Sequence, residues 1–234
     1  MEQKIGFNDM LRHLLEVDDY TWGLYAFSRE LLNKRIQPQE RDAMIKKAIA
    51  CGKEYAKRTI QETGSQDINI ISDKLNLQVE YSNASMIGKR ILFANFTPPS
   101  KIEIIKEPVK QLVTQIQKET PFLVEHFKQN DIINIILGHE IFHSVEERYE
   151  QTIYTRTEKI LLWNFLGFKN YSVIRTLGEI GAMAFTKEIN GINYSPFIYD
   201  VLLYYCYDPA GAWKIYYEVL ANQVRKVHGA IENC

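Results

Sequence analysis

The sequence has few cysteines and no long apolar run, and each absence excludes a class of protein. The three cysteines, Cys51, Cys206 and Cys234, are odd in number and never form a CxxC pair. They argue against a disulfide framework and against a cysteine zinc site. No apolar run approaches the roughly 18 residues that a transmembrane helix needs. The first residues also lack the basic and apolar regions of a signal peptide, so we expect a cytoplasmic protein in a reducing setting.

The charge is balanced and includes no block of Lys or Arg. The chain has 28 Lys and Arg against 29 Asp and Glu in 234 residues, a formal net charge of −1. This composition predicts neither general nucleic-acid binding nor a membrane partner. With 46% hydrophobic and 24% charged residues, the chain is typical of a globular domain with a buried core.

The pattern of apolar residues predicts an α+β fold that is predominantly helical. Residues 7–35 read as two helices meeting near Gly23, and 38–63 reads as one long helix that ends at Gly64. A short helix then leads into the first of roughly three strands, which are predicted at 77–81, 90–96 and 101–106. The last two strands are predicted to form a hairpin around the turn TPPS. Nearly everything after Glu107 looks helical, with helices expected at 107–118, 121–129, 131–150, 172–190, 196–207 and 210–228.

Two of only five histidines, His139 and His143, lie four residues apart in the motif H-E-I-F-H. Residues i and i+4 share one face of a helix, so both imidazoles can approach a single metal ion. Glu140 lies about 100° around the helix from His139 and is therefore not a ligand on the same face. It can instead take a proton from a water bound to the metal. The competing interpretation is that both histidines are half-buried helix residues with local hydrogen bonds.

A catalytic zinc needs three protein ligands and one open position, so a third ligand must be found. Glu147 would lie about 12 Å along the helix axis from His139, and a solvated charge is the better interpretation of it. The zincin pattern with a third histidine is absent, because Glu146 and Tyr149 occupy the corresponding positions. A carboxylate from a later helix is the remaining solution.

Glu179 is the best candidate for that carboxylate. It lies in TLGEIGAMAFTKEI, an apolar segment whose small residues allow close helix packing. Burying a charge among Gly and Ala is costly unless the charge is paired or bound to metal. An ordinary salt bridge is the competing role for Glu179. Glu150 and Glu158 lie in a polar, loop-like stretch and remain open as ligands, whereas Glu188 is expected on the opposite face of the helix.

The paired motifs H-E-I-F-H and G-E-I-G-A-M-A-F-T-K-E-I resemble the signature of the ImmA/IrrE-type metallopeptidases. The segment DINIISDKLNLQVEY resembles the short helix and first strand of the same family, and the similarity covers roughly residues 40–192. It implies a zincin-like fold in which His139, His143 and Glu179 bind Zn²⁺ and Glu140 is the general base. The expected organisation is an N-terminal helical extension (1–36), a metallopeptidase-like domain (37–192), and C-terminal helices packed on that domain (193–234).

The resemblance also implies a function, a zinc-dependent endopeptidase that acts in the bacterial cytoplasm. The family members that act on proteins cleave transcriptional repressors, often of the helix-turn-helix type, so a protein or peptide substrate is expected. The strand at 101–106 would be the sheet edge along which an extended peptide lies. Zinc is not distinguished from other divalent ions by these ligands.

Met183 departs from the family pattern and supports an alternative function. It lies four residues after Glu179, where the family usually has a polar residue that supports the metal ligands. The alternative is therefore a catalytically weak or inactive regulatory module that binds proteins. DNA binding through residues 65–78 is a third hypothesis, and it is disfavoured because the next residues, QVEYS, alternate as a strand and bring no basic side chains.

Overall fold

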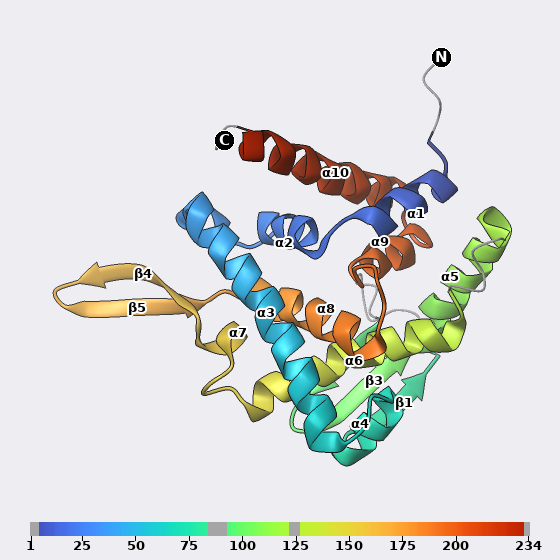
Figure 1. Ribbon diagram of the computed structural model, residues 1–234, viewed down its shortest axis with the longest axis horizontal. Helices are drawn as coiled ribbons and strands as arrows, with labels where there is room; N and C mark the ends of the chain where they lie inside the picture. Colours follow the sequence, from blue (N-terminus) through green and yellow to red (C-terminus); the bar gives the residue numbers. More distant parts are fainter. Residues whose placement is uncertain (1–4, 84–92, 122–126, 232–234) are drawn as a thin grey trace.

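The computed structural model describes residues 5–83, 93–121 and 127–231. This part of the chain is α+β and predominantly helical, as predicted (Figure 1). The strands are β1 (Gln78–Ser82), β2 (Ala94–Thr97), β3 (Lys101–Ile105), β4 (Lys159–Phe165) and β5 (Phe168–Val173). The helices are α1 (Phe7–Glu16), α2 (Asp19–Ser28), η1 (Asn33–Arg35), α3 (Pro38–Thr63), α4 (Ile68–Lys74), α5 (Lys106–Glu119), α6 (Gln129–Arg148), α7 (Tyr154–Thr157), α8 (Thr176–Asn190), α9 (Ile198–Tyr205) and α10 (Pro209–Ile231).

The first three strands form a mixed sheet in the order β1-β3-β2. β2 and β3 are antiparallel, which confirms the predicted hairpin, and β1 runs parallel to β3. The prediction that 101–106 is a sheet edge is wrong, because β3 is paired on both sides. The central position of β3 in the sheet agrees with its apolar side chains, because Ile102 and Ile104 are fully buried. Among the residues that the structure describes, the edges of this sheet are β1 and β2. Residues 90–92 of the predicted strand 90–96 lie outside the described residues.

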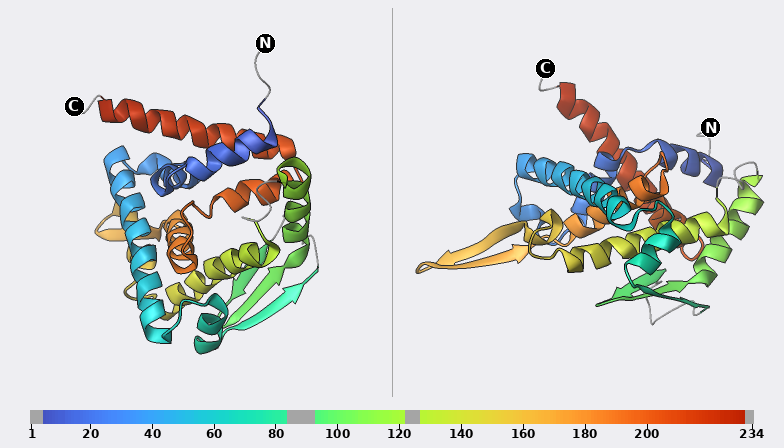
Figure 2. Two further views of the ribbon diagram at one scale, coloured as in Figure 1. Left: turned by 45° about the vertical axis from the view of Figure 1, so that its right-hand side comes forward. Right: turned by 60° about the horizontal axis from the view of Figure 1, so that its bottom comes forward.

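The long helix α3 and the helix α8 pack closely against each other (Figures 1 and 2). α3 begins with Pro38 in its first turn and ends at Gly64, whose φ of 69° is the left-handed conformation that glycine adopts without strain. Gly52 sits where the two helices approach, and a Cβ added there would collide with the carbonyl oxygen of Gly181. This approach brings α8 alongside both α3 and α6.

Two expectations about helices are corrected by the structure. The first two helices do not meet near Gly23, which lies inside α2. The chain breaks at Val17 and Asp18 instead, because the Asp18 carboxylate accepts a hydrogen bond from Thr21 N (2.8 Å) and caps α2. The predicted helix 172–190 begins only at Thr176. Residues 122–126 of the predicted helix 121–129 lie outside the described residues.

Residues 159–173 form a β-hairpin that the sequence analysis did not predict. Its turn uses Leu166 and Gly167, both with positive φ, and the paired strands are rich in aromatic and β-branched residues. The hairpin projects from the body of the molecule (Figures 1 and 2). Its tip is open to solvent, with Phe165, Leu166 and Phe168 exposed by 67%, 82% and 74%. In the part of the chain that the structure describes, no helix is long and apolar enough to cross a membrane.

Candidate metal centre

The site is built from one face of α6 and the first turn of α8. On α6, the Nε2 atoms of His139 and His143 lie 3.1 Å apart. From α8, the Glu179 carboxylate approaches both rings, with Oε2 3.3 Å from His139 Nε2 and Oε1 3.8 Å from His143 Nε2. The structure therefore brings together the three residues that the sequence predicted as ligands, and their ligand atoms all lie within 4.8 Å of one another.

The spacing of these atoms fits a small divalent metal ion. Two ligands about 2.1 Å from one tetrahedral ion lie about 3.4 Å apart. Nε2 of His139 lies 3.1 Å from Nε2 of His143 and 3.3 Å from Glu179 Oε2, both close to this value. The separation of 3.8 Å from His143 Nε2 involves the other carboxylate oxygen, Oε1. Two imidazoles and one carboxylate also leave a fourth position open, as in catalytic zinc sites. This group can bind a metal, and its donor atoms suit several divalent ions.

Glu179 and His139 stabilise each other's charged forms. Burial works against a charge on His139, but the hydrogen bond and the negative charge of Glu179 outweigh it and raise its pKa to about 9. Burial likewise favours the neutral form of Glu179, yet His139 and then His143 lower its pKa to about 2. The Glu179 side chain is 53% exposed by area. One side of the carboxylate lines the open pocket, which accounts for the exposed area. Protein atoms surround its other sides, which accounts for the effect of burial on its pKa. The carboxylate is thus ionised, as a metal ligand must be.

His143 is oriented by Glu146, a residue that the sequence analysis did not assign to the site. Nδ1 of His143 lies 2.9 Å from Glu146 Oε2, and the Glu146 side chain is only 3% exposed. The same carboxylate accepts a hydrogen bond from Thr155 Oγ1 and lies 3.5 Å from Arg156 Nε. A carboxylate that holds the outer nitrogen of a histidine fixes its ring and raises its basicity. The i, i+3 spacing from His143 was the available signal.

His139 has no comparable support. Its Nδ1 atom is buried and forms no hydrogen bond with any described residue. Met183, which the sequence analysis noted as a departure, lines the same pocket as His139 and offers only a thioether. The outer nitrogens of the two histidines therefore differ: a carboxylate contacts Nδ1 of His143, whereas Nδ1 of His139 has no hydrogen bond among the described residues.

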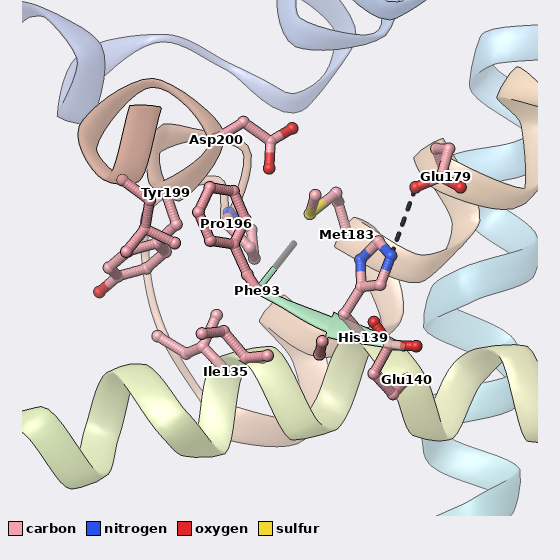
Figure 3. A pocket seen from close by; sticks show the side chains of 12 residues that line it. Phe93, Ile135, His139, Glu140, Glu179, Met183, Pro196, Tyr199 and Asp200 are labelled. Carbon is pink, nitrogen blue, oxygen red and sulfur yellow. Dashed lines mark ion pairs between the residues drawn. The ribbon is translucent and has the colours of Figure 1, made fainter. Parts of the chain in front are cut away.

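Glu140 is buried, at 8% exposure, and lines the pocket beside His139 (Figure 3). The other acidic candidates are not brought to the site. Glu147 lies near Arg156, with 3.8 Å between Oε2 and Nη2, and Glu188 pairs with Lys57 at 3.7 Å. Neither belongs to the metal-binding group, and neither do Glu150 and Glu158.

A pocket of about 180 Å³ adjoins the metal centre. Helices α6, α8 and α9 line it together with the segment that enters β2 (Figure 3). Its walls are mainly apolar, and Asp200 of α9 adds a carboxylate that the sequence analysis did not single out. Tyr199 of α9 also lines the pocket, although its side chain is almost fully buried.

In comparisons with known proteins, no family model, no curated protein and no solved structure matches this chain. The similarity to ImmA/IrrE-type metallopeptidases therefore rests on the motifs themselves.

Proposed function

We propose that the protein is a zinc-dependent endopeptidase of the ImmA/IrrE type with a zincin-like fold. The observation that carries this proposal is the convergence of His139 and His143 with Glu179 from a different helix. The buried Glu140 and an adjoining pocket add support, because a structural metal site needs neither.

The side chains around the centre have distinct roles in peptide hydrolysis. A zinc ion held by His139, His143 and Glu179 would polarise the scissile carbonyl and lower the pKa of water toward neutrality. Glu140 would accept a proton from the attacking water on a carboxylate oxygen and later deliver it to the leaving amine. Glu146 would keep the His143 ring in place throughout.

The free edge of β2 suits a protein substrate that binds in an extended conformation. Within the described residues β2 is an edge strand, and its first residue, Ala94, lines the pocket beside the metal centre together with the preceding Phe93. An extended segment can add to such an edge through backbone hydrogen bonds. The substrate that the family resemblance favours is a helix-turn-helix repressor in the bacterial cytoplasm.

Two observations favour a second function, a regulatory protein-binding module with little or no catalysis. His139 Nδ1 has no hydrogen-bond partner among the described residues, and Met183 takes the place of a polar side chain. Losing the support of a ligand typically lowers metal affinity or activity 10–100-fold.

Metal content and peptide cleavage in matched variants test the proposal. Wild type, Glu140→Gln and Glu147→Gln are reconstituted with zinc, and a proteome-derived peptide mixture is searched for new termini by mass spectrometry. We expect zinc in all three proteins and cleavage by all except Glu140→Gln. Zinc without cleavage in any of them would favour the binding module. A wild-type protein that takes up no zinc would overturn the assignment of the centre.

A further inference from the structure

Asp200 is the carboxylate in the pocket that the metal centre does not use. It projects from the first turn of α9, and in Figure 3 its carboxyl group points into the space between Met183 and Pro196. Within residues 5–83, 93–121 and 127–231, no side chain forms a hydrogen bond or ion pair with it. An acidic residue in the first turn of a helix interacts favourably with the helix dipole. That interaction does not explain why the Asp200 side chain lines the pocket.

Asp200 is exposed at the pocket, yet the protein packed around its carboxylate still disfavours the charged form. Burial, followed by the negative charge of Glu179, raises the pKa of Asp200 to about 7, although His139 acts in the opposite direction. The carboxylate still reaches the solvent in the pocket, so a ligand can contact it. A cation that entered the pocket would supply the missing partner for the ionised form.

The apolar lining of the pocket favours a cation that carries an apolar stem. Ile135, Met183 and Leu203 line the same pocket as Asp200 and present apolar surface there. Long basic side chains have a matching form, because their methylene stems pack on apolar surface while the charged head finds a polar partner. A purely apolar side chain would fill the same walls but would leave the Asp200 carboxylate without a partner of opposite charge.

The charges of the loaded site also favour a basic ligand. Glu140, Glu179 and Asp200 contribute three negative charges when ionised, and Zn²⁺ contributes two positive charges, which leaves −1. One ammonium or guanidinium group brings this local sum to zero. An acidic side chain would instead meet the repulsion of Asp200 at short range.

We propose that this pocket selects a lysine or arginine side chain next to the bond that is cut, with Asp200 as the residue that determines this specificity. The inference rests on the proposed peptidase function. It makes the substrate a protein segment with a basic residue at the scissile bond.

Two metal-binding probes of matched shape test the inference without needing a substrate. Lysine hydroxamate and norleucine hydroxamate have the same carbon stem and differ by the ammonium group. Their affinities for the zinc-loaded full chain are measured by calorimetry. We expect lysine hydroxamate to bind on the order of tenfold more tightly to wild type. Equal affinities, or tighter binding of norleucine hydroxamate, would overturn the specificity.

Variants assign the preference to one residue. Asp200→Asn removes the charge and should reduce the affinity ratio to about one, while zinc content stays as in wild type. Glu147→Gln removes a charge from α6 outside the pocket and should leave the ratio unchanged. A preference that persists in Asp200→Asn would overturn the role of Asp200. If Asp200→Asn fails to fold, the wild-type ratio still decides the specificity.

The hydroxamate measurements distinguish failure of the basic specificity from failure of the peptidase function. Binding of both hydroxamates with no preference would contradict only the basic pocket. If neither hydroxamate bound the zinc-loaded chain, the open coordination position would be absent, and the proposed function would fall together with the pocket.

Discussion

His143 Nδ1 lies 2.9 Å from Oε2 of the buried Glu146, so a carboxylate one turn further along the same helix holds the outer side of a ring in the candidate metal centre. Thr155 and Arg156 in turn contact that carboxylate from outside α6. Glu146 therefore supports a residue of the candidate metal centre without belonging to the group that could hold the ion.

Glu146→Gln is therefore expected to weaken zinc binding by about 10–100-fold, as for other residues that orient metal ligands. Gln keeps the size of the side chain but removes its charge, so the loss reports on orientation and basicity of His143. Competition with a chromogenic chelator measures the affinity. Glu147→Gln, its neighbour outside the metal group, is the control and should bind as wild type. Equal affinity for both variants would show that Glu146 is merely structural.

The stability of the metal-free protein is expected to depend on pH through the pair His139 and Glu179. The pKa of His139 is raised from 6.5 to about 9, so its contribution is complete below pH 6.5 and is lost as pH rises through 9. The pKa of Glu179 is lowered from 4.5 to about 2, so its contribution is present above pH 4.5 and is lost as pH falls toward 2. The pair therefore stabilises the metal-free fold most between about pH 4.5 and 6.5.

Thermal unfolding of the chelator-treated protein at several pH values measures this effect. The variant Glu179→Gln should lose less stability than wild type between pH 6 and pH 9.5, because its His139 no longer has the charged partner. Parallel pH profiles for the two proteins would contradict the coupling of these residues.

Gly52→Ala is expected to destabilise the fold by about 1–3 kcal/mol, the usual effect of overpacking a close contact. The added Cβ would collide with the carbonyl oxygen of Gly181 on α8, the helix that carries Glu179. Zinc affinity should fall as well, since α8 must move. Glu54→Ala, on the exposed side of α3, is the control for both measurements. Chemical denaturation and chelator competition give the two values, and an unchanged stability of Gly52→Ala would contradict the close packing.

Phe168→Ala and Phe185→Ala should differ greatly although they delete the same atoms. Phe168 is 74% exposed on the hairpin, and its loss should change the free energy of unfolding by no more than about 0.5 kcal/mol. Phe185 is fully buried on α8, and its loss should cost about 3–5 kcal/mol. Urea denaturation measures both. A large loss for Phe168→Ala would indicate that the hairpin packs against the body in solution.

The hairpin β4–β5 shows where interpretation of the sequence was wrong. The sequence predicts a helix that begins at residue 172, whereas residues 172 and 173 belong to β5. The aromatic residues of 163–171 are exposed, so they do not follow the rule that apolar residues mark the buried face of a strand or helix. The apolar pattern therefore does not predict strands in this segment. Strand pairing decided the structure of this segment instead.

The prediction that residues 101–106 form the sheet edge for a peptide is wrong because strand neighbours are not a local property. A strand pattern in the sequence indicates that residues 101–105 are extended, but not which strands lie beside them. The parallel pairing of β1 with β3 joins residues more than twenty positions apart, and it leaves β2 as the edge next to the metal centre.

The sequence by itself determined the helix that presents His139 and His143, because their spacing and the apolar stripe around them are local properties. It also indicated Glu179, through the cost of placing a carboxylate among small apolar residues. Only the tertiary structure decided which acidic residue meets the two imidazoles, since α8 reaches them by packing on α3 through Gly52. Tertiary structure likewise brought Asp200, 61 positions after His139, into the pocket beside the metal centre. Distances between helices depend on how whole faces pack, and no short motif encodes them.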